Sequence, residues 1–225
     1  MNITIRNEDE KDYRKVEEVT REGFWNHFQP GADEHFLLHN LRKSPDFISE
    51  LDFVIEADGE IIGNIVFSKA HVIDANGIAR EVITFGPVTI LPDYQKRGLG
   101  RKLIRHAIQA ATDMGFKAIL IYGDPRFYGR LGFRAAERYD ITTANGYFAI
   151  GLMAYELQPG ALQNISGRFE ESAAYQIDQS GLEAFDRSFE KKQKRETDFH
   201  REFQILLSLV YKAEQEKLHS GKRIL

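Results

Sequence analysis

Hydrophobic and polar positions in the first part of the chain form short, regular patterns that alternate between strand and helix types. Residues 3–5 alternate apolar and polar side chains, which predicts a strand, and residues 13–20 repeat apolar positions at helical spacing. A second helix is expected over residues 33–43, with Asp33 available as a cap near its start and Ser44-Pro45 ending it.

The middle of the chain predicts three antiparallel strands in succession. The strands cover residues 51–57, 60–73 and 80–91, and the dipeptides Asp58-Gly59 and Asn76-Gly77 separate them. Both dipeptides adopt the positive φ angles that tight hairpins need. A β-meander is therefore expected here.

The elements after the meander are expected to add a parallel strand to the sheet. After Pro92 a glycine loop leads into a helix with apolar residues every three or four positions, and residues 118–122 form a short apolar run. That run is expected to be a buried strand parallel to the preceding one, because a helix carries the chain back. One or two helical turns over residues 126–131 and a strand pair on either side of Asn145-Gly146 complete an α/β (α+β) fold, a mixed sheet with helices on both faces.

The character of the sequence changes after Pro159-Gly160, which predicts a domain over residues 1–157 and an extension over 158–225 that is mainly helical. A capping-box pattern at residues 180–183 opens one expected helix, and apolar stripes follow within residues 182–189 and 199–210. We expect these stripes to pack on the core or on a partner helix.

Composition restricts the chemistry. The 225 residues carry a net charge of −4, so the chain as a whole does not attract nucleic acid or an anionic membrane. There are no cysteines, which removes a thiol nucleophile, a covalent thioester on the enzyme, disulfides and thiolate metal sites. No uncharged run approaches membrane-spanning length and the first residues are polar, so a cytoplasmic location is expected.

The glycine loop is the strongest candidate for a binding site. Backbone N–H groups at a helix start form an anion site, and Gly98 and Gly100 leave their amides open to close approach. Four basic residues gather at the same helix end, where cations are mildly destabilising unless an anion is bound: Lys96, Arg97, Arg101 and Lys102. The alternative is a solvated surface turn. The P-loop and dinucleotide fingerprints are both absent, which disfavours nucleotide hydrolysis and hydride transfer.

Two segments give the chain a resemblance to a known family. Residues 88–92 followed by Gln95-Lys96-Arg97-Gly98-Leu99-Gly100 resemble the acetyl-coenzyme A signature of the GNAT N-acetyltransferase superfamily, and residues 127–133 resemble its second recurrent segment. The resemblance covers residues 1–157 and implies a mostly antiparallel central sheet whose fourth and fifth strands splay apart around the pantetheine arm. Bacterial subfamilies with the Gly-Asp-Pro segment seen at residues 123–125 carry comparable C-terminal extensions.

The resemblance also implies which residues contact the coenzyme. The backbone at Val88 and Ile90 would bond the pantetheine and the thioester carbonyl, and amides from Lys96 to Arg101 would hold the pyrophosphate. The implied coenzyme-binding set is Val88, Ile90, Gln95, Lys96, Arg97, Gly98, Leu99, Gly100, Arg101, Phe127 and Tyr128. The acyl donor would be acetyl-coenzyme A or a close analogue.

Catalytic candidates follow from the same comparison. Tyr128 matches the tyrosine that faces the coenzyme sulfur and would protonate the departing thiolate; the alternative is an ordinary core tyrosine. Glu81 is the one acid on its strand before Gly86, yet its offset from Gln95 fits the family base poorly, and a solvated carboxylate is the better interpretation.

Two further groups near the start of the chain carry alternatives. Trp25, His27 and Phe28 line the acceptor pocket or act as core anchors. His35 and His39 stand one helical turn apart, but without a third ligand they predict paired surface histidines and no metal site.

The expected activity is direct transfer of an acetyl group to a small-molecule or peptide amine. The runner-up is a catalytically inactive acyl-coenzyme A sensor that uses the same loop. The identity of the acceptor lies beyond the sequence, because one fold serves many acceptors. The sequence leaves open whether the chain forms a homodimer.

Overall fold

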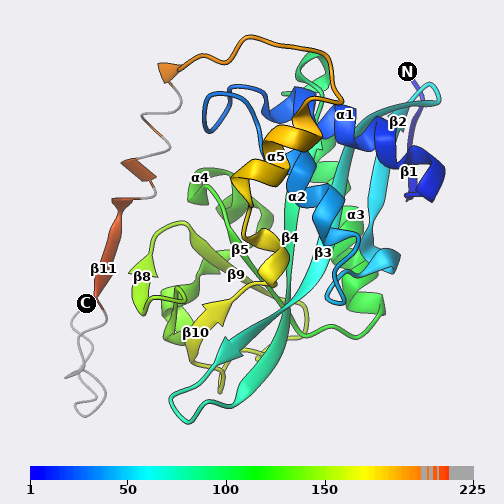
Figure 1. Cartoon of the computed structure of the whole chain (residues 1–225). Coiled ribbons are helices and arrows are strands. Elements are labelled where there is room, and N and C mark those ends of the chain that lie inside the picture. Colours follow the sequence, from blue (N-terminus) through cyan, green and yellow to red (C-terminus); the bar gives the residue numbers. More distant parts are fainter. Residues whose placement is uncertain (199–201, 203–204, 207, 213–225) are drawn as a thin grey trace.

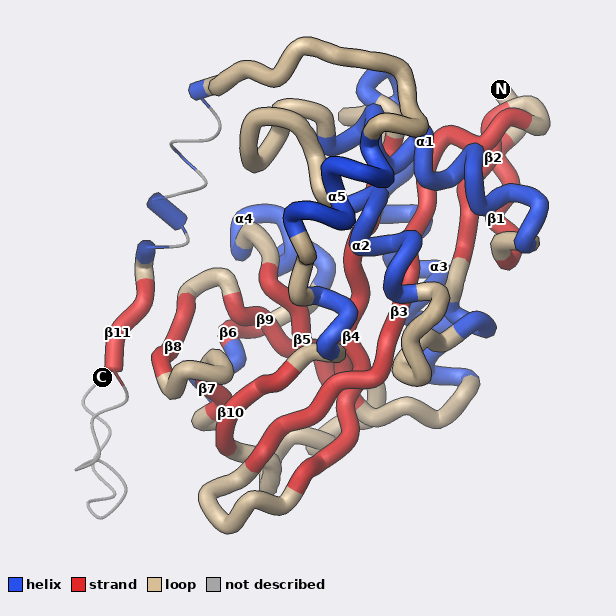
Figure 2. The backbone as a smooth tube through the Cα atoms, in the orientation of Figure 1, coloured by secondary structure: helices blue, strands red, loops and turns tan. Residues whose placement is uncertain are grey.

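A computed structural model of the protein describes residues 1–198, 202, 205–206 and 208–212. Its centre is a sheet of nine strands, seven of which lie in the order β1-β2-β3-β4-β5-β9-β6, while β10 pairs with β3 and β7 (Figures 1 and 2). The bounds are β1 Ile3–Asn7, β2 Phe53–Ala57, β3 Glu60–Ile73, β4 Ala79–Ile90, β5 Ala118–Tyr122, β6 Arg134–Ala135, β7 Ile141–Thr142, β9 Leu152–Glu156 and β10 Gly167–Glu170. The mixed, mostly antiparallel sheet is the one expected.

Helices cover both faces of this sheet, because alternate residues of the strands point to opposite sides. Helix α3 (Leu99–Asp113) packs with Phe53 and Ile55 on one face. Helices α1 (Tyr13–Phe24) and α2 (Glu34–Leu41) pack with Val54 on the other. The predicted α/β layering is confirmed.

The long hairpin of β3 and β4 positions the site. The two strands pair antiparallel from Ile73↔Ala79 to Gly63↔Ile90, so β4 is held firmly along one edge. On its other edge β4 is in parallel register with β5 only at Ile83↔Ile119. Beyond Ile83 the two strands part, and β4 runs on to Ile90 without a strand on that side among the described residues.

Residues 133–157 fold differently from the expected strand pair around Asn145-Gly146. They form short pieces: β9 lies between β5 and β6, β7 pairs with β10, and β8 (Tyr147–Ala149) pairs with β11 (Val210–Lys212). A 3-10 helix at Ala136–Tyr139, followed by Asp140 in a left-handed conformation, interrupts the first strand. The turn signal was correct, but pairing with distant strands decided the partners.

Residues after 157 return to the core. Besides β10, they form α5 (Gln179–Asp186), which Asp178 caps by accepting from the N–H groups of Ser180 and Gly181. The cap is therefore Asp178, two residues before the predicted box. The following segment crosses the loop after α1, where Arg195 donates its backbone N–H to the Asn26 side chain (Figure 1).

Helix α5 also accounts for His35, which is fully buried and not at the surface as expected. Its Nε2 lies 3.2 Å from Asp186, which also forms a 2.7 Å ion pair with the buried Arg21. Burial lowers the pKa of His35 to about 4. His39 pairs instead with Glu17 at 2.9 Å. Within the described ranges, no helix has the length and apolar character to span a bilayer.

Candidate functional site

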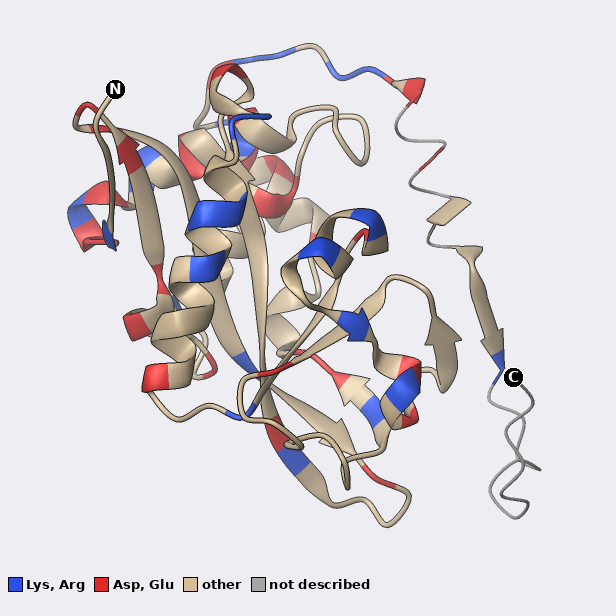
Figure 3. Cartoon of the chain, turned by 180° about the vertical axis from the view of Figure 1, so that it is seen from behind, with Lys and Arg blue, Asp and Glu red and all other residues tan. Residues whose placement is uncertain are grey.

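The glycine loop enters α3 with its first amides open. Lys96 and Gly98 adopt positive φ angles of 59° and 80°, left-handed conformations of the kind found in backbone loops that bind anions. No described residue accepts a hydrogen bond from the backbone N–H groups of residues 98–101, and the first helical turn contains no acid. Figure 3 shows the basic residues gathered at this end of α3. The arrangement is an anion site built from backbone and charge.

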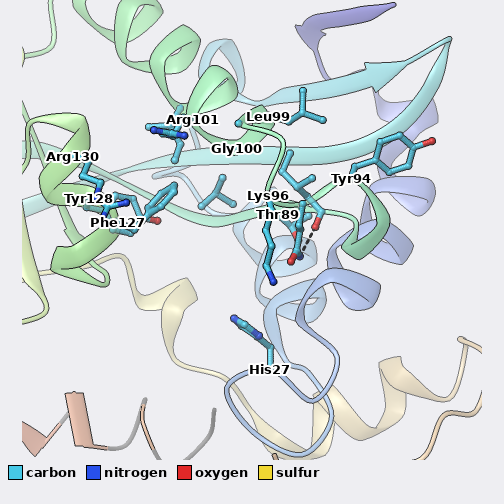
Figure 4. Close-up of a pocket in the computed structure, with 15 residues that line it drawn as sticks. His27, Thr89, Tyr94, Lys96, Leu99, Gly100, Arg101, Phe127, Tyr128 and Arg130 are labelled. Carbon is cyan, nitrogen blue, oxygen red and sulfur yellow. Dashed lines mark hydrogen bonds between the residues drawn. The ribbon is translucent and has the colours of Figure 1, made fainter. Parts of the chain in front are cut away.

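A cavity of about 590 Å³ lies against this loop and the free edge of β4 (Figure 4). In the close-up, Phe127, Tyr128 and Arg130 lie on one side and Tyr94 and Lys96 on the other. The predicted coenzyme-binding residues that line it are Val88, Ile90, Gln95, Lys96, Gly98, Leu99, Gly100, Arg101, Phe127 and Tyr128, and His27, predicted for the acceptor pocket, lines it as well. Arg97 does not line it, and its guanidinium lies 5.6 Å from the Tyr94 ring centre instead.

Two residues of the glycine loop have different structural roles. The Gln95 side chain donates to the Ile90 backbone oxygen at 2.9 Å, so it fixes the loop to the end of β4 and does not face the anion site. Gly100, in contrast, has no structural need to be glycine. A Cβ there would meet Ile90 at 3.7 Å, an ordinary contact, and its φ is not positive. The space left open at Gly100 therefore faces the cavity.

Tyr128 is positioned by close packing of α4 (Pro125–Tyr128) against the end of β5. A Cβ at Gly123 would lie 2.3 Å from the Tyr128 ring, so only glycine lets the ring occupy this place. The ring also packs on Phe85 and Phe133, with centroids at 5.9 and 5.6 Å. Its hydroxyl makes no hydrogen bond to another described residue, and burial raises the pKa of the phenol, which keeps it protonated.

A second cavity of about 400 Å³ adjoins the first. The two share four lining residues, His27, Val88, Phe127 and Tyr128. The second cavity is bounded by the α1–α2 region, β4 and the start of α4, with Leu206 contributing from the C-terminal segment. Tyr128 thus lies where a basic, loop-lined cavity meets one whose walls include six Phe and Tyr side chains.

Besides Arg97, two sequence-predicted residues, Glu81 and Trp25, line neither of these cavities. Glu81 is at the other end of β4, 52% exposed, 3.8 Å from Lys69, and lines a separate hollow. Trp25 lines neither of the two adjoining cavities, and its indole donates to the Gln193 backbone oxygen at 3.2 Å. Phe28 lines only the second cavity. In the described part of the chain, no group of three His, Asp or Glu side chains is arranged to hold a metal.

The structure adds residues that sequence reasoning missed. Tyr94 and Arg130 line the first cavity and stand within or beside the two recognised segments, so their proximity in sequence could have found them. Glu34, at the start of α2, lines the second cavity. Burial, with a smaller contribution from the charge of Asp33, raises the pKa of the Glu34 carboxyl to about 8. Nothing in the sequence near Glu34 signals this placement.

Comparisons with known proteins agree with this geometry. The model of the acetyltransferase (GNAT) family matches residues 5–133. The uncharacterized N-acetyltransferase YhbS of Escherichia coli K12 is 25% identical over 134 residues, which are 60% of this chain and 78% of that protein.

Solved structures give the same result. The crystal structure of Escherichia coli YhbS in complex with CoA has a TM-score of 0.69 at 24% identity, over 78% of this chain and 92% of that one. A GNAT family acetyltransferase from Brucella melitensis in complex with acetyl-CoA has a TM-score of 0.63 at 25% identity, over 78% and 99%. Since the family model spans more than half of the sequence and the fold agrees, the chain belongs to the acetyltransferase (GNAT) family.

Proposed function

We propose that this protein is an N-acetyltransferase that binds acetyl-coenzyme A in the first cavity and transfers the acetyl group directly to an amine bound in the second. The observation that carries the proposal is the junction of the two cavities at Val88, Phe127 and Tyr128. A two-substrate reaction needs two sites that meet where bonds change.

The loop supports the donor half of the proposal. A pyrophosphate carries negative charge, and the open amides of residues 98–101 with Lys96 and Arg101 supply donors and positive charge in the same place. Arg130 lines the opposite side of the cavity. The bound CoA and acetyl-CoA of the two structural relatives are of the matching chemical class.

The parting of β4 from β5 supports the placement of the acyl arm. Beyond Ile83 the edge of β4 that faces β5 has no strand partner in the described structure, so peptide groups of this stretch other than the Gly86 and Ile90 oxygens, which accept from Tyr175 and Gln95, are available to a ligand. Val88 lies on this stretch and lines both cavities. An acyl thioester laid along this edge would present its carbonyl at the junction.

The absence of cysteine supports direct transfer, because the chain has no thiol to carry the acetyl group. The amine nitrogen attacks the thioester carbonyl, the C–N bond forms, and the C–S bond breaks. The Tyr128 phenol would then donate its proton to the sulfur. Because the phenol is a weaker acid than a thiol and burial raises its pKa further, its role as proton donor would depend on the position of its hydroxyl and not on its acidity.

The test measures acetyl-coenzyme A binding by calorimetry and release of free thiol in the presence of a panel of amines. Tyr128→Phe should lower kcat by about 10²-fold while leaving the Kd for acetyl-coenzyme A within about twofold. Tyr147→Phe removes a hydroxyl that lies outside both cavities and serves as the control.

Two results would contradict the proposal in different ways. No binding of acetyl-coenzyme A would remove the donor site. Binding without any amine-stimulated thiol release would instead favour the sensor function. An unchanged kcat in Tyr128→Phe, when chemistry limits turnover, would remove only Tyr128 from the mechanism.

A further inference from the structure

Six of the seventeen residues that line the second cavity are Phe or Tyr. Phe24 and Phe28, with ring centroids 5.7 Å apart, come from the end of α1 and the loop after it, and Phe85 comes from β4. Tyr122 and Phe127 line it from the end of β5 and from α4. Walls of this kind gain free energy by covering an apolar or aromatic group of a ligand.

Three carboxyl groups also line this cavity, and two of them share a cation. Asp124 forms a 2.7 Å ion pair with Arg126, and the charge of Glu202 acts on the same guanidinium. Glu34 differs, because no Lys or Arg of the described residues lies within ion-pair distance of it. Its carboxyl group accepts the backbone N–H of Asp33 at 3.1 Å, and its other hydrogen bonds are to its own backbone and to the Asp33 side chain, none of which carries a positive charge.

A half-buried carboxylate without a cation is costly, since neither water nor a counter-charge fully compensates it, so the Glu34 carboxyl keeps its proton at neutral pH in the free protein and ionises when a cation binds beside it. A ligand that brings a positive charge removes this cost. An ammonium group is such a charge, and it is also the ordinary protonated form of an acceptor amine. The wall that holds Glu34 therefore selects for a cation at one end of an apolar ligand.

The size of the cavity limits the ligand further. About 400 Å³ holds on the order of a dozen waters at roughly 30 Å³ each. That volume suits a single-ring amine with a short linker. A narrow aliphatic stem, such as that of a lysine side chain, would leave much of the aromatic wall uncovered.

We propose that the acceptor is a small primary amine carried on an aromatic body, and that Glu34 holds its ammonium group and accepts its proton. The inference rests on the proposed function and deepens it by naming the acceptor class. Glu34 and Tyr128 line the same cavity, so a ligand that fills it would contact both the proton acceptor and the residue beside the proposed thioester.

The proton balance of the step is complete with these two groups. The ammonium gives one proton to the Glu34 carboxylate, and the resulting amine attacks the carbonyl carbon as the C–S bond breaks. Tyr128 gives its hydroxyl proton to the departing thiolate, and the nitrogen then loses a second proton, which restores the Tyr128 hydroxyl. The products are the N-acetylated amine and the free thiol, and Glu34 returns its proton to solvent.

The test compares four acceptors with acetyl-coenzyme A in the thiol-release assay of the full chain. 2-Phenylethylamine is the expected substrate, ethylamine lacks the ring, L-phenylalanine adds a carboxylate, and a short lysine-containing peptide represents the protein alternative. We expect kcat/KM for 2-phenylethylamine to exceed that of each other acceptor by about 10- to 100-fold. Repulsion from Glu34 and Asp124 disfavours L-phenylalanine in particular.

Variants then separate the role of Glu34 from a purely structural one. Glu34→Gln should lower kcat/KM for 2-phenylethylamine by about 10²-fold. Glu34→Asp, which keeps a carboxyl group, should recover part of that loss. Both variants should keep the wild-type Kd for acetyl-coenzyme A. Glu60→Gln changes an exposed glutamate at the Asp58–Gly59 turn that lines neither cavity, and it should behave as wild type.

The possible failures are distinguishable. Loss of acetyl-coenzyme A binding in the wild-type chain would overturn the proposed function itself. Normal binding with a preference for ethylamine, L-phenylalanine or the peptide would overturn the acceptor class alone. Normal binding with no active amine would favour the sensor function and so overturn the proposed function. Full activity of Glu34→Gln on 2-phenylethylamine would remove Glu34 from proton transfer and recognition.

Discussion

Gly100→Ala should move stability and ligand affinity in opposite directions, because the protein has room for the new methyl group and the ligand does not. The added Cβ would lie 3.7 Å from Ile90, which is normal van der Waals contact, and the φ at this position is available to alanine. Alanine is favoured over glycine in a helix by about 0.5–1 kcal/mol. The melting temperature of the free protein should therefore rise by about 1–4 °C.

Affinity for acetyl-coenzyme A should fall in the same variant. The proposed pyrophosphate site uses the amides of residues 98–101, none of which donates to another described residue. A methyl group beside one of them would displace a phosphate oxygen and weaken a charge-assisted hydrogen bond that contributes about 1.5–3 kcal/mol. The Kd should rise about 10- to 150-fold.

Calorimetry gives the Kd and a thermal melt gives the stability of the same sample. Gly98→Ala is the matched comparison, since its φ of 80° is strained for alanine and predicts a loss of stability. A Gly100→Ala protein that is more stable and binds acetyl-coenzyme A as tightly as wild type would refute the reasoning. The phosphates would then have to lie away from Gly100.

Further predictions test other parts of the structure. Gly123→Ala would bring a Cβ within 2.3 Å of the Tyr128 ring, so kcat should fall at least about tenfold while calorimetry still detects acetyl-coenzyme A binding. An unchanged kcat would contradict the packing argument. Asp186→Ala leaves the buried Arg21 without its 2.7 Å partner and should lower the free energy of unfolding, measured by urea denaturation, by on the order of 3 kcal/mol. A change under about 0.5 kcal/mol would mean that α5 docks by apolar contacts alone. The pKa of Glu34, raised from 4.5 to about 8, means that the folded state holds a proton that the unfolded chain releases, so this residue makes stability fall as pH rises from about 4.5 to 8. Glu34→Gln should thus raise the melting temperature relative to wild type more at pH 8.5 than at pH 5, and an equal difference at both values would contradict the shifted pKa.

The order of elements was determined by local sequence. The meander was readable from Asp58-Gly59 and Asn76-Gly77, because tight turns depend on residue types within a few positions. The glycine loop and the basic start of α3 were readable for the same reason, and ten of the eleven predicted coenzyme-side residues line one cavity. Arg97 is the exception, because its position within the loop did not reveal the direction of its side chain.

Tertiary packing decided what local sequence could not. The sequence predicted His35 at the surface, but α5 and the residues just after it, more than 140 positions later in the chain, bury it. Phe185, Phe189 and Asp186 make these contacts. Glu34 became part of a cavity only because α2, β4 and the C-terminal segment close around it, and its shifted pKa depends on that closure. Burial and the distance between groups remote in sequence are properties of the folded chain, whereas turn and helix preferences belong to its residues.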